Sequence, residues 1–133
     1  MASMFRTSVL LVLAALMICS HAGTSNAMQY GDACRLSDIH VSTAKTGKVV
    51  GGQPEYRVTI ENICDCGQWT VLVACNGLKS TEPVDQTKIF SRGDGTCVVN
   101  AGNLISRGSP VVFTYAWNEP QAFTPTFAIT RCP

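Results

Sequence analysis

The chain has 133 residues, a formal net charge of +1 and only 14% charged residues. That length is enough for one domain, and so small a net charge gives no strong field with which to bind nucleic acid or an anionic membrane surface. The basic residues are also dispersed along the chain rather than clustered with aromatic residues, so we expect no nucleic-acid partner.

The first residues have the pattern of a secretory signal peptide. One positive charge precedes an apolar run from Ser8 to Ile18, and this run is shorter than a membrane-spanning helix requires. Small residues follow at Ser20–Ala22 and again at Ser25–Ala27, and both triplets suit cleavage. We therefore predict a signal peptide of residues 1–22, with cleavage as late as residue 27 also compatible, and a cysteine-rich domain over residues 28–133. The mature protein should be secreted and free of the membrane.

The chain has seven cysteines, and removal of the signal peptide with Cys19 leaves an even number. Cysteines in a small secreted chain are typically paired in disulfides, each of which stabilises the fold by about 2–4 kcal/mol. Cys64 and Cys66 are too close in sequence to bond to each other without strain, and the sequence leaves the other pairings open. Three disulfides are expected among six residues: Cys34, Cys64, Cys66, Cys75, Cys97 and Cys132.

A metal site is the alternative role for these cysteines. Cys64-x-Cys66 together with Cys75 could supply thiolates for zinc, but zinc sites usually show two C-x-x-C pairs or a mixture of cysteine and histidine. An oxidising compartment also removes thiolates. We expect no bound metal and no cofactor.

The domain should begin near Cys34 and continue into a strand over Ser37–Thr43, in which Ile39 and Val41 share the buried face. Lys45–Lys48 is predicted to form a turn. Val49–Pro54 should form a second irregular link, because its glycines permit positive φ and its proline would end strand pairing.

The stretch Gln53–Cys75 should supply the two central strands. Tyr56, Val58 and Ile60 alternate with polar residues, which is typical of a strand with one buried face. Trp69–Ala74 is apolar on both faces, which favours a strand covered on both sides with Trp69 in the core.

Short strand-like runs separated by turn residues continue to the end of the chain. The Asp-Gly pair within Arg92–Gly95 indicates a hairpin turn, and this turn explains the Arg-Gly-Asp tripeptide without any cell-adhesion receptor. In the last run, Phe127 and Ile129 share one face. The expected fold is an all-β, disulfide-stapled β-sandwich of about seven or eight short antiparallel strands. Its later strands are predicted at residues 84–90, 96–100, 111–117 and 123–131.

Catalytic chemistry has little support in this sequence. His40 is the one histidine outside the signal region, it falls on the expected solvent face of the first strand, and no Gly-x-Ser-x-Gly elbow is present. A glycosidase needs a pair of carboxylates at a suitable separation, and the scattered acidic residues of this chain give no sign of such a pair. We therefore expect no catalytic residue and no enzyme activity. The carboxylates considered are Glu55, Glu61, Asp65, Asp94 and Glu119.

A longer series of residues resembles the tapetum determinant family, whose members are small secreted cysteine-rich proteins of plants. The resemblance covers essentially the whole mature chain. It rests on the order of the six cysteines, on Pro54–Cys66, on Cys97–Gly102 and on the Phe-x-Tyr-Ala-Trp pattern of Phe113–Trp117. The close spacing of Cys64 and Cys66 is similar to that of a short branch of the family.

The resemblance implies an extracellular signal in the apoplast. Members of the family act as ligands of a leucine-rich-repeat receptor kinase on neighbouring anther cells and help to specify tapetal and reproductive cell fate. By resemblance, we expect the ectodomain of such a receptor kinase to be the partner of this chain. The receptor-binding residues cannot be read from the sequence, because a fold alone does not locate a site.

Two other classes of secreted protein remain as alternatives. A cell-wall carbohydrate-binding module would need a row of exposed aromatic residues on one sheet, whereas the sequence pattern places most aromatic residues, including Trp69 and Trp117, in the core. A protease inhibitor would need an exposed loop bracketed by cysteines, and Lys79–Arg92 between Cys75 and Cys97 is the candidate segment.

Overall fold

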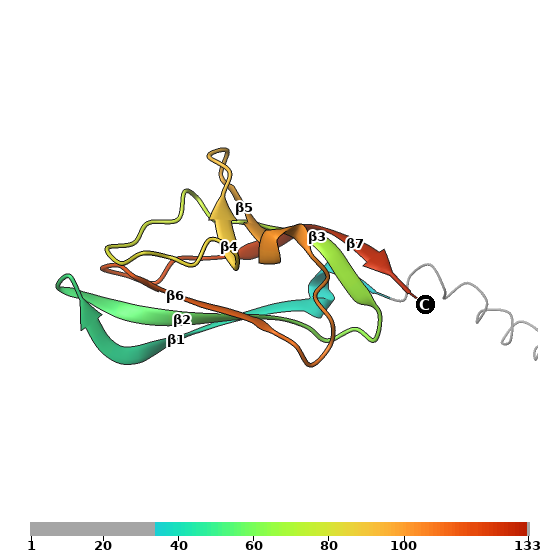
Figure 1. Cartoon of the computed structure of the whole chain (residues 1–133), viewed down its shortest axis with the longest axis horizontal. Coiled ribbons are helices and arrows are strands. Elements are labelled where there is room, and N and C mark those ends of the chain that lie inside the picture. The colour runs from blue at the N-terminus through green and yellow to red at the C-terminus, as the bar shows by residue number, and fades with distance from the viewer. Residues whose placement is uncertain (1–33, 133) are drawn as a thin grey trace, which may run out of the picture. The chain divides into compact units, whose positions relative to one another are not determined.

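A computed structural model describes residues 34–132 and shows two antiparallel sheets that face each other (Figure 1). One sheet has three strands in the order β1-β2-β6, and the other has four in the order β4-β5-β3-β7. The predicted β-sandwich is confirmed, and the predicted signal peptide lies outside the described residues. The strands are β1 (Ile39–Val50), β2 (Gln53–Asn62), β3 (Gly67–Ala74), β4 (Ile89–Ser91), β5 (Thr96–Val99), β6 (Val111–Ala116) and β7 (Thr124–Arg131), with short 3-10 helices at Leu36–Asp38 and Asn100–Gly102.

The core lies between the two sheets and follows the predicted alternation of β2 and β6. Val58, Ile60 and Tyr115 are fully buried. The ring of Tyr115 stacks on that of Tyr56, with 5.3 Å between centroids, and Phe123 closes over Tyr115 edge-on at 5.9 Å. Burial of each large apolar side chain contributes about 1.5–3 kcal/mol, so this cluster stabilises the contact between the two sheets.

The first hairpin differs from its prediction. β1 continues to Val50, and the turn falls at Gly51 and Gly52, whose φ values of 59° and 79° suit a two-residue hairpin turn. Pro54 pairs with Val49 instead of ending the strand, and the predicted turn at Lys45–Lys48 is an irregularity within β1. The pairing of β1 with β2 on both sides of that irregularity therefore outweighs the local turn signals.

The strand predicted at residues 84–90 is also shorter than expected. The side chain of Asp85 accepts hydrogen bonds from the backbone and hydroxyl of Thr87, and the Lys88 backbone N–H donates to the Asp85 carbonyl. These local bonds favour a turn over an extended chain. Pairing with β5 begins only at Ile89.

A β-bulge in β3 reverses the predicted orientation of Trp69. The pairing of β3 with β7 is interrupted between Trp69 and Leu72, and Thr70 has a φ of 50°. Regular alternation from Val71 would place Trp69 inside, but the extra residue turns Gln68 inward and Trp69 outward. Trp69 is accordingly exposed while Gln68 is buried, so the prediction that Trp69 lies in the core is wrong.

Three disulfides join the six predicted cysteines. Cys34 pairs with Cys64, Cys66 with Cys132, and Cys75 with Cys97. As expected, Cys64 and Cys66 do not pair with each other. They instead connect the linker between β2 and β3 to both ends of the described chain, while the third disulfide holds the end of β3 to β5.

A buried asparagine organises the linker that carries these cysteines. Asn62 is 1% exposed, and its amide group donates to the carbonyl oxygens of Cys66 and Ile105, both at 2.9 Å. Its carbonyl oxygen accepts from the Cys64 backbone N–H at 3.0 Å and from the Gln68 amide at 3.1 Å. Both donors and both acceptor positions of the side chain are therefore in use.

A second buried polar contact joins the first hairpin to the loop that follows β3. Glu55 is 5% exposed and accepts a hydrogen bond of 2.6 Å from the Thr46 hydroxyl, which holds the pKa of Glu55 below its usual value. Burial raises the pKa of Glu82, and the neighbouring Glu55 carboxylate raises that pKa further. One oxygen of Glu82 is buried and has no hydrogen-bond partner among the described residues.

Replacement of Asn62 by alanine should lower the free energy of unfolding by about 2–4 kcal/mol, because four buried partners lose their hydrogen bonds. Asn62→Asp should cost at least as much, since a carboxylate oxygen would then face two carbonyl oxygens. Urea denaturation of the oxidised protein measures both changes. The exposed Asn118 offers a control, because Asn118→Ala should stay within about 0.5 kcal/mol of the parent. A loss below about 1 kcal/mol for Asn62→Ala would contradict the role given to this residue.

Glu82→Gln should raise the Tm at pH 7. The pKa of Glu82 is higher in the folded state than the ordinary glutamate value of 4.5, so stability falls as the pH rises from 4.5 through the raised pKa and this carboxyl loses its proton. Glutamine removes that loss, and the advantage of the variant should vanish below pH 4.5. Glu55→Gln should act oppositely at pH 7, since the lowered pKa of Glu55 gives stability that is lost only as the pH falls through it. Thermal unfolding at several pH values measures both, and a Glu82→Gln gain that is independent of pH would refute this assignment.

Candidate functional site

The outer faces of the two sheets differ in character. The outer face of the sheet β1-β2-β6 is largely polar, and its exposed residues include His40, Ser42, Ala44, Arg57, Glu61 and Val112. The sheet β4-β5-β3-β7 instead presents aromatic and aliphatic side chains to solvent. We call these residues the apolar outer face: Phe90, Val98, Leu72, Phe127, Ile129 and Trp69.

The strand register arranges the apolar outer face as a continuous surface. Phe90 lies opposite Val98, Val98 opposite Leu72, and Leu72 opposite Phe127, so four side chains cross the whole sheet. At a strand spacing of about 4.8 Å, this row is about 14 Å long. Phe90 and Phe127 are 47% and 45% exposed. An apolar surface of this kind on a small protein commonly marks a contact with another molecule.

The apolar outer face continues into a shallow groove at the start of β3. Trp69, Leu104 and Arg131 line the groove, which has a volume of about 450 Å³. Gly67 also lines the groove, and a side chain there would collide with Leu104. Asp65 also lines the groove, and it pairs with Arg107 at 2.6 Å. Arg131 has no ion-pair partner among the described residues.

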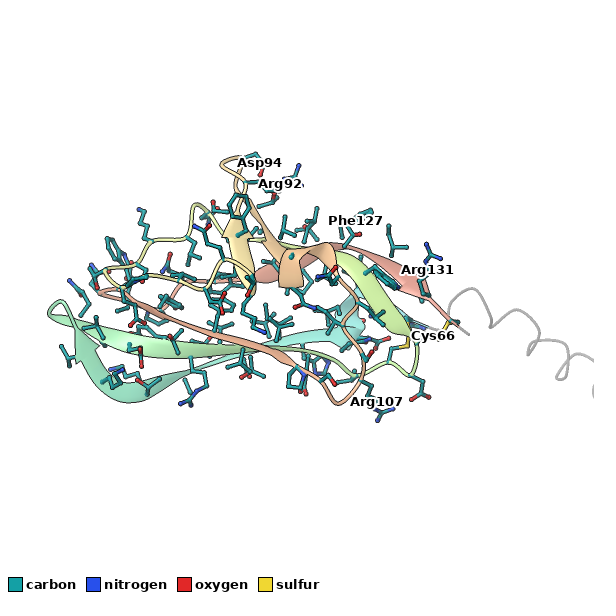
Figure 2. The ribbon with its side chains drawn as sticks, viewed as in Figure 1. Cys66, Arg92, Asp94, Arg107, Phe127 and Arg131 are labelled. Carbon is teal, nitrogen blue, oxygen red and sulfur yellow. A yellow bond between two sulfur atoms is a disulfide. The ribbon has the colours of Figure 1, made fainter. Side chains whose placement is uncertain are left out.

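The hairpin between β4 and β5 borders the same face. Arg92 and Asp94 form an ion pair of 3.6 Å, and Figure 2 shows both on the outer side of this sheet together with Phe127 and Arg131. A carboxylate oxygen of Asp94 accepts hydrogen bonds from the hydroxyl and the backbone N–H of Thr96, which hold the pKa of Asp94 below its usual range. These bonds give the Arg-Gly-Asp tripeptide a structural role in the turn.

The structure places two of the residues weighed for chemistry on facing strands and joins the candidate cysteines in disulfides. His40 is exposed on β1, opposite Glu61 of β2. Three cysteine sulfurs, those of Cys34, Cys66 and Cys132, lie within 4.8 Å of one another, but each belongs to a disulfide and offers no thiolate to a metal. The apolar outer face supplies contact area, and the groove supplies Arg131, which has no ion-pair partner within residues 34–132, so this arrangement is suited to binding.

Sequence reasoning did not identify the apolar outer face. The sequence predicts that Phe127 and Ile129 share one face of the last strand, and the structure shows that this face points to solvent while Ala128 packs against the core. One signal in the sequence could have indicated this arrangement. β7 is rich in threonine, and the face that carries threonine and alanine offers little apolar volume to the core. Only the register with β3 fixes which side is outward.

Among the described residues, no helix is long and apolar enough to cross a membrane. The family described as "Tapetum determinant 1, C-terminal" matches residues 35–132. The chain is 33% identical over 89 residues to the TPD1 protein homolog 1 of Arabidopsis thaliana, covering 65% of this chain and 49% of that protein. It is 28% identical over 86 residues to the TPD1 protein homolog 1B of Oryza sativa subsp. japonica, covering 64% and 51% respectively.

The chain therefore spans about half the length of these curated relatives. No solved structure matches it at a significant level. The family match covers both sheets, both cysteines of two disulfides, Cys64 of the third, the apolar outer face and the groove. On this evidence, the chain belongs to the tapetum determinant 1 family.

Proposed function

We propose that this protein is a secreted extracellular ligand of a leucine-rich-repeat receptor kinase and that it acts in anther and reproductive cell-fate specification. The observation that carries the proposal is the family match over residues 35–132, which includes every described strand. The three disulfides support secretion, because such bonds form and persist in oxidising compartments. The relatives are about twice as long as the matched segment, so their complete activity is not transferred.

The structure supports a role in binding through its rigidity and its surface. Disulfides at both ends of the described chain and across β3 and β5 limit movement of the sheets. The apolar outer face is built on strands rather than on long loops, so its side chains are held in fixed positions before a partner arrives. Such preorganisation lowers the entropy lost on binding.

A second candidate function is binding to cell-wall polysaccharide. The aromatic rings of Trp69, Phe90 and Phe127 are exposed on one sheet, which is the feature that a carbohydrate-binding module requires. Within this apolar outer face, however, the side chains between the rings are aliphatic. Val98, Leu72 and Ile129 cannot form hydrogen bonds with sugar hydroxyl groups. The receptor is therefore the better-supported partner.

Binding of the oxidised protein to a panel of plant leucine-rich-repeat receptor ectodomains tests the proposal. We expect saturable binding to at least one ectodomain, and a loss of at least about tenfold in affinity after reduction and alkylation, because the linker then loses its connections to both chain ends. Biolayer interferometry gives the affinities, and mass spectrometry confirms three disulfides in the starting sample.

Columns of insoluble wall polysaccharide provide the comparison. Retention on such a column, combined with no binding to any ectodomain, would contradict the ligand proposal and favour the polysaccharide function. Elution in the void volume, combined with binding to an ectodomain, would exclude polysaccharide as the principal partner.

A further inference from the structure

The solvent-facing sides of the two sheets differ in how many apolar residues they expose. Val112 is the large apolar residue exposed on the outer face of β6, and polar residues surround it. On the other sheet, six aromatic and aliphatic residues are continuous across β4, β5, β3 and β7. A protein that needed only to be soluble would gain from polar residues there, because exposed apolar patches promote association.

The outward position of Trp69 is accompanied by backbone strain at the next residue, Thr70. Thr70 is β-branched and has a φ of 50°, a conformation that is unfavourable for such residues by about 1–3 kcal/mol. The strained residue forms the bulge that turns Trp69 outward, and Gln68 is held inward by its hydrogen bond to Asn62. Bulges often re-aim a side chain at a binding surface.

We propose that the apolar outer face is a docking surface for a protein partner whose own contact patch is apolar and carries a carboxylate that pairs with Arg131. Trp69, Ile129, Phe127 and Phe90 would supply the apolar contact, and the groove beside Leu104 would receive the acidic side chain. This inference rests on the proposed function for the identity of the receptor, but the chemistry of the surface is argued from the structure alone.

The charges around the face select an acidic partner. Arg92 is already paired with Asp94, and Asp65 with Arg107, whereas Arg131 remains unpaired among the described residues. These two ion pairs are neutral, so the hairpin and the groove together with Arg107 carry a net charge of +1 from Arg131. A buried cation without a counter-charge is costly, so a partner that covers Arg131 needs a carboxylate opposite it.

The same charges disfavour a second copy of this chain. A two-fold dimer places the same face against itself. Each copy would then bring an Arg131 that lacks an ion-pair partner in the described part of the chain, while Asp94, the acidic residue of the adjoining hairpin, is already bonded to Arg92 and Thr96. Both arginines would compete for groups that already have partners.

The chemistry of the surface also disfavours a polysaccharide. Sugar hydroxyl groups that lose water must find new hydrogen bonds, and an unsatisfied buried polar group costs free energy. The centre of the apolar outer face is formed by Leu72 and Val98, which offer none. An apolar protein surface would make no such demand there.

Selection of phage-displayed peptides on the immobilised, oxidised protein tests the surface without requiring the natural receptor. We expect most selected peptides to combine apolar residues with Asp or Glu and to bind Phe127→Asp at least about tenfold more weakly, since central apolar contacts dominate interfaces. Val112→Asp, a matched change on the other sheet, should alter binding by no more than about twofold. Arg131→Glu should weaken binding more than Lys45→Glu on exposed β1 does.

The ectodomain found in the receptor panel is then measured with the same variants. Weaker binding of Phe127→Asp, with Val112→Asp unaffected, supports both proposals. Equal binding of all variants to the ectodomain and to the peptides overturns the docking surface while the ligand function stands. Failure of every ectodomain, with peptides that still require Phe127, contradicts the ligand function and supports the surface.

Three controls keep the test decisive. Thermal unfolding and disulfide mapping verify each variant, and Phe90→Thr, which keeps a residue suited to strands, replaces Phe127→Asp if the latter does not fold. A dimer in sedimentation velocity that Phe127→Asp dissociates would overturn the proposal in favour of self-association. Retention on a polysaccharide column that Phe127→Asp abolishes would overturn it in favour of sugar.

Discussion

The hydrogen bonds of Asn62 are the constraint on which the rest of the structure depends. This side chain connects the end of β2, the cysteine linker, the start of β3 and the segment at Ile105. Its inward position continues the alternation of Val58 and Ile60, so an amide occupies a place where an apolar residue would be expected. A buried polar group that uses all of its hydrogen bonds specifies one arrangement of its neighbours, because any other leaves it unsatisfied.

The outer surface of the opposite sheet follows from that internal arrangement. Asn62 binds the Gln68 side chain inside the sandwich, the bulge at Thr70 restores the inward position of Val71, and Trp69 is left facing solvent. A core interaction and a surface feature are thus consecutive parts of the same strand. This link gives a physical reason for the strained backbone of Thr70, which would otherwise be an unfavourable choice within a strand.

Much of the fold could be predicted from local patterns. The alternation in β2 and β6 and the hairpin at Asp94 and Gly95 depend on residues close in sequence, and the number of disulfides follows from the cysteine count alone. Three features could not be predicted from local patterns. The extent of the first hairpin and the outward face of β7 depend on pairing between strands, and the orientation of Trp69 depends on a bulge. The candidate site was missed for the same reason: Phe90, Leu72 and Phe127 are neighbours only in the folded sheet.

The orientation of Trp69 is the central claim, and fluorescence of single-tryptophan proteins tests it most directly. The chain has two tryptophans, so Trp117→Phe isolates the emission of Trp69, and Trp69→Phe isolates that of the partly buried Trp117. We expect a red-shifted emission for the exposed Trp69 and stronger quenching by iodide than for Trp117. A blue-shifted Trp69 emission that iodide does not quench would place this ring in the core and contradict the bulge, the groove and the apolar outer face together.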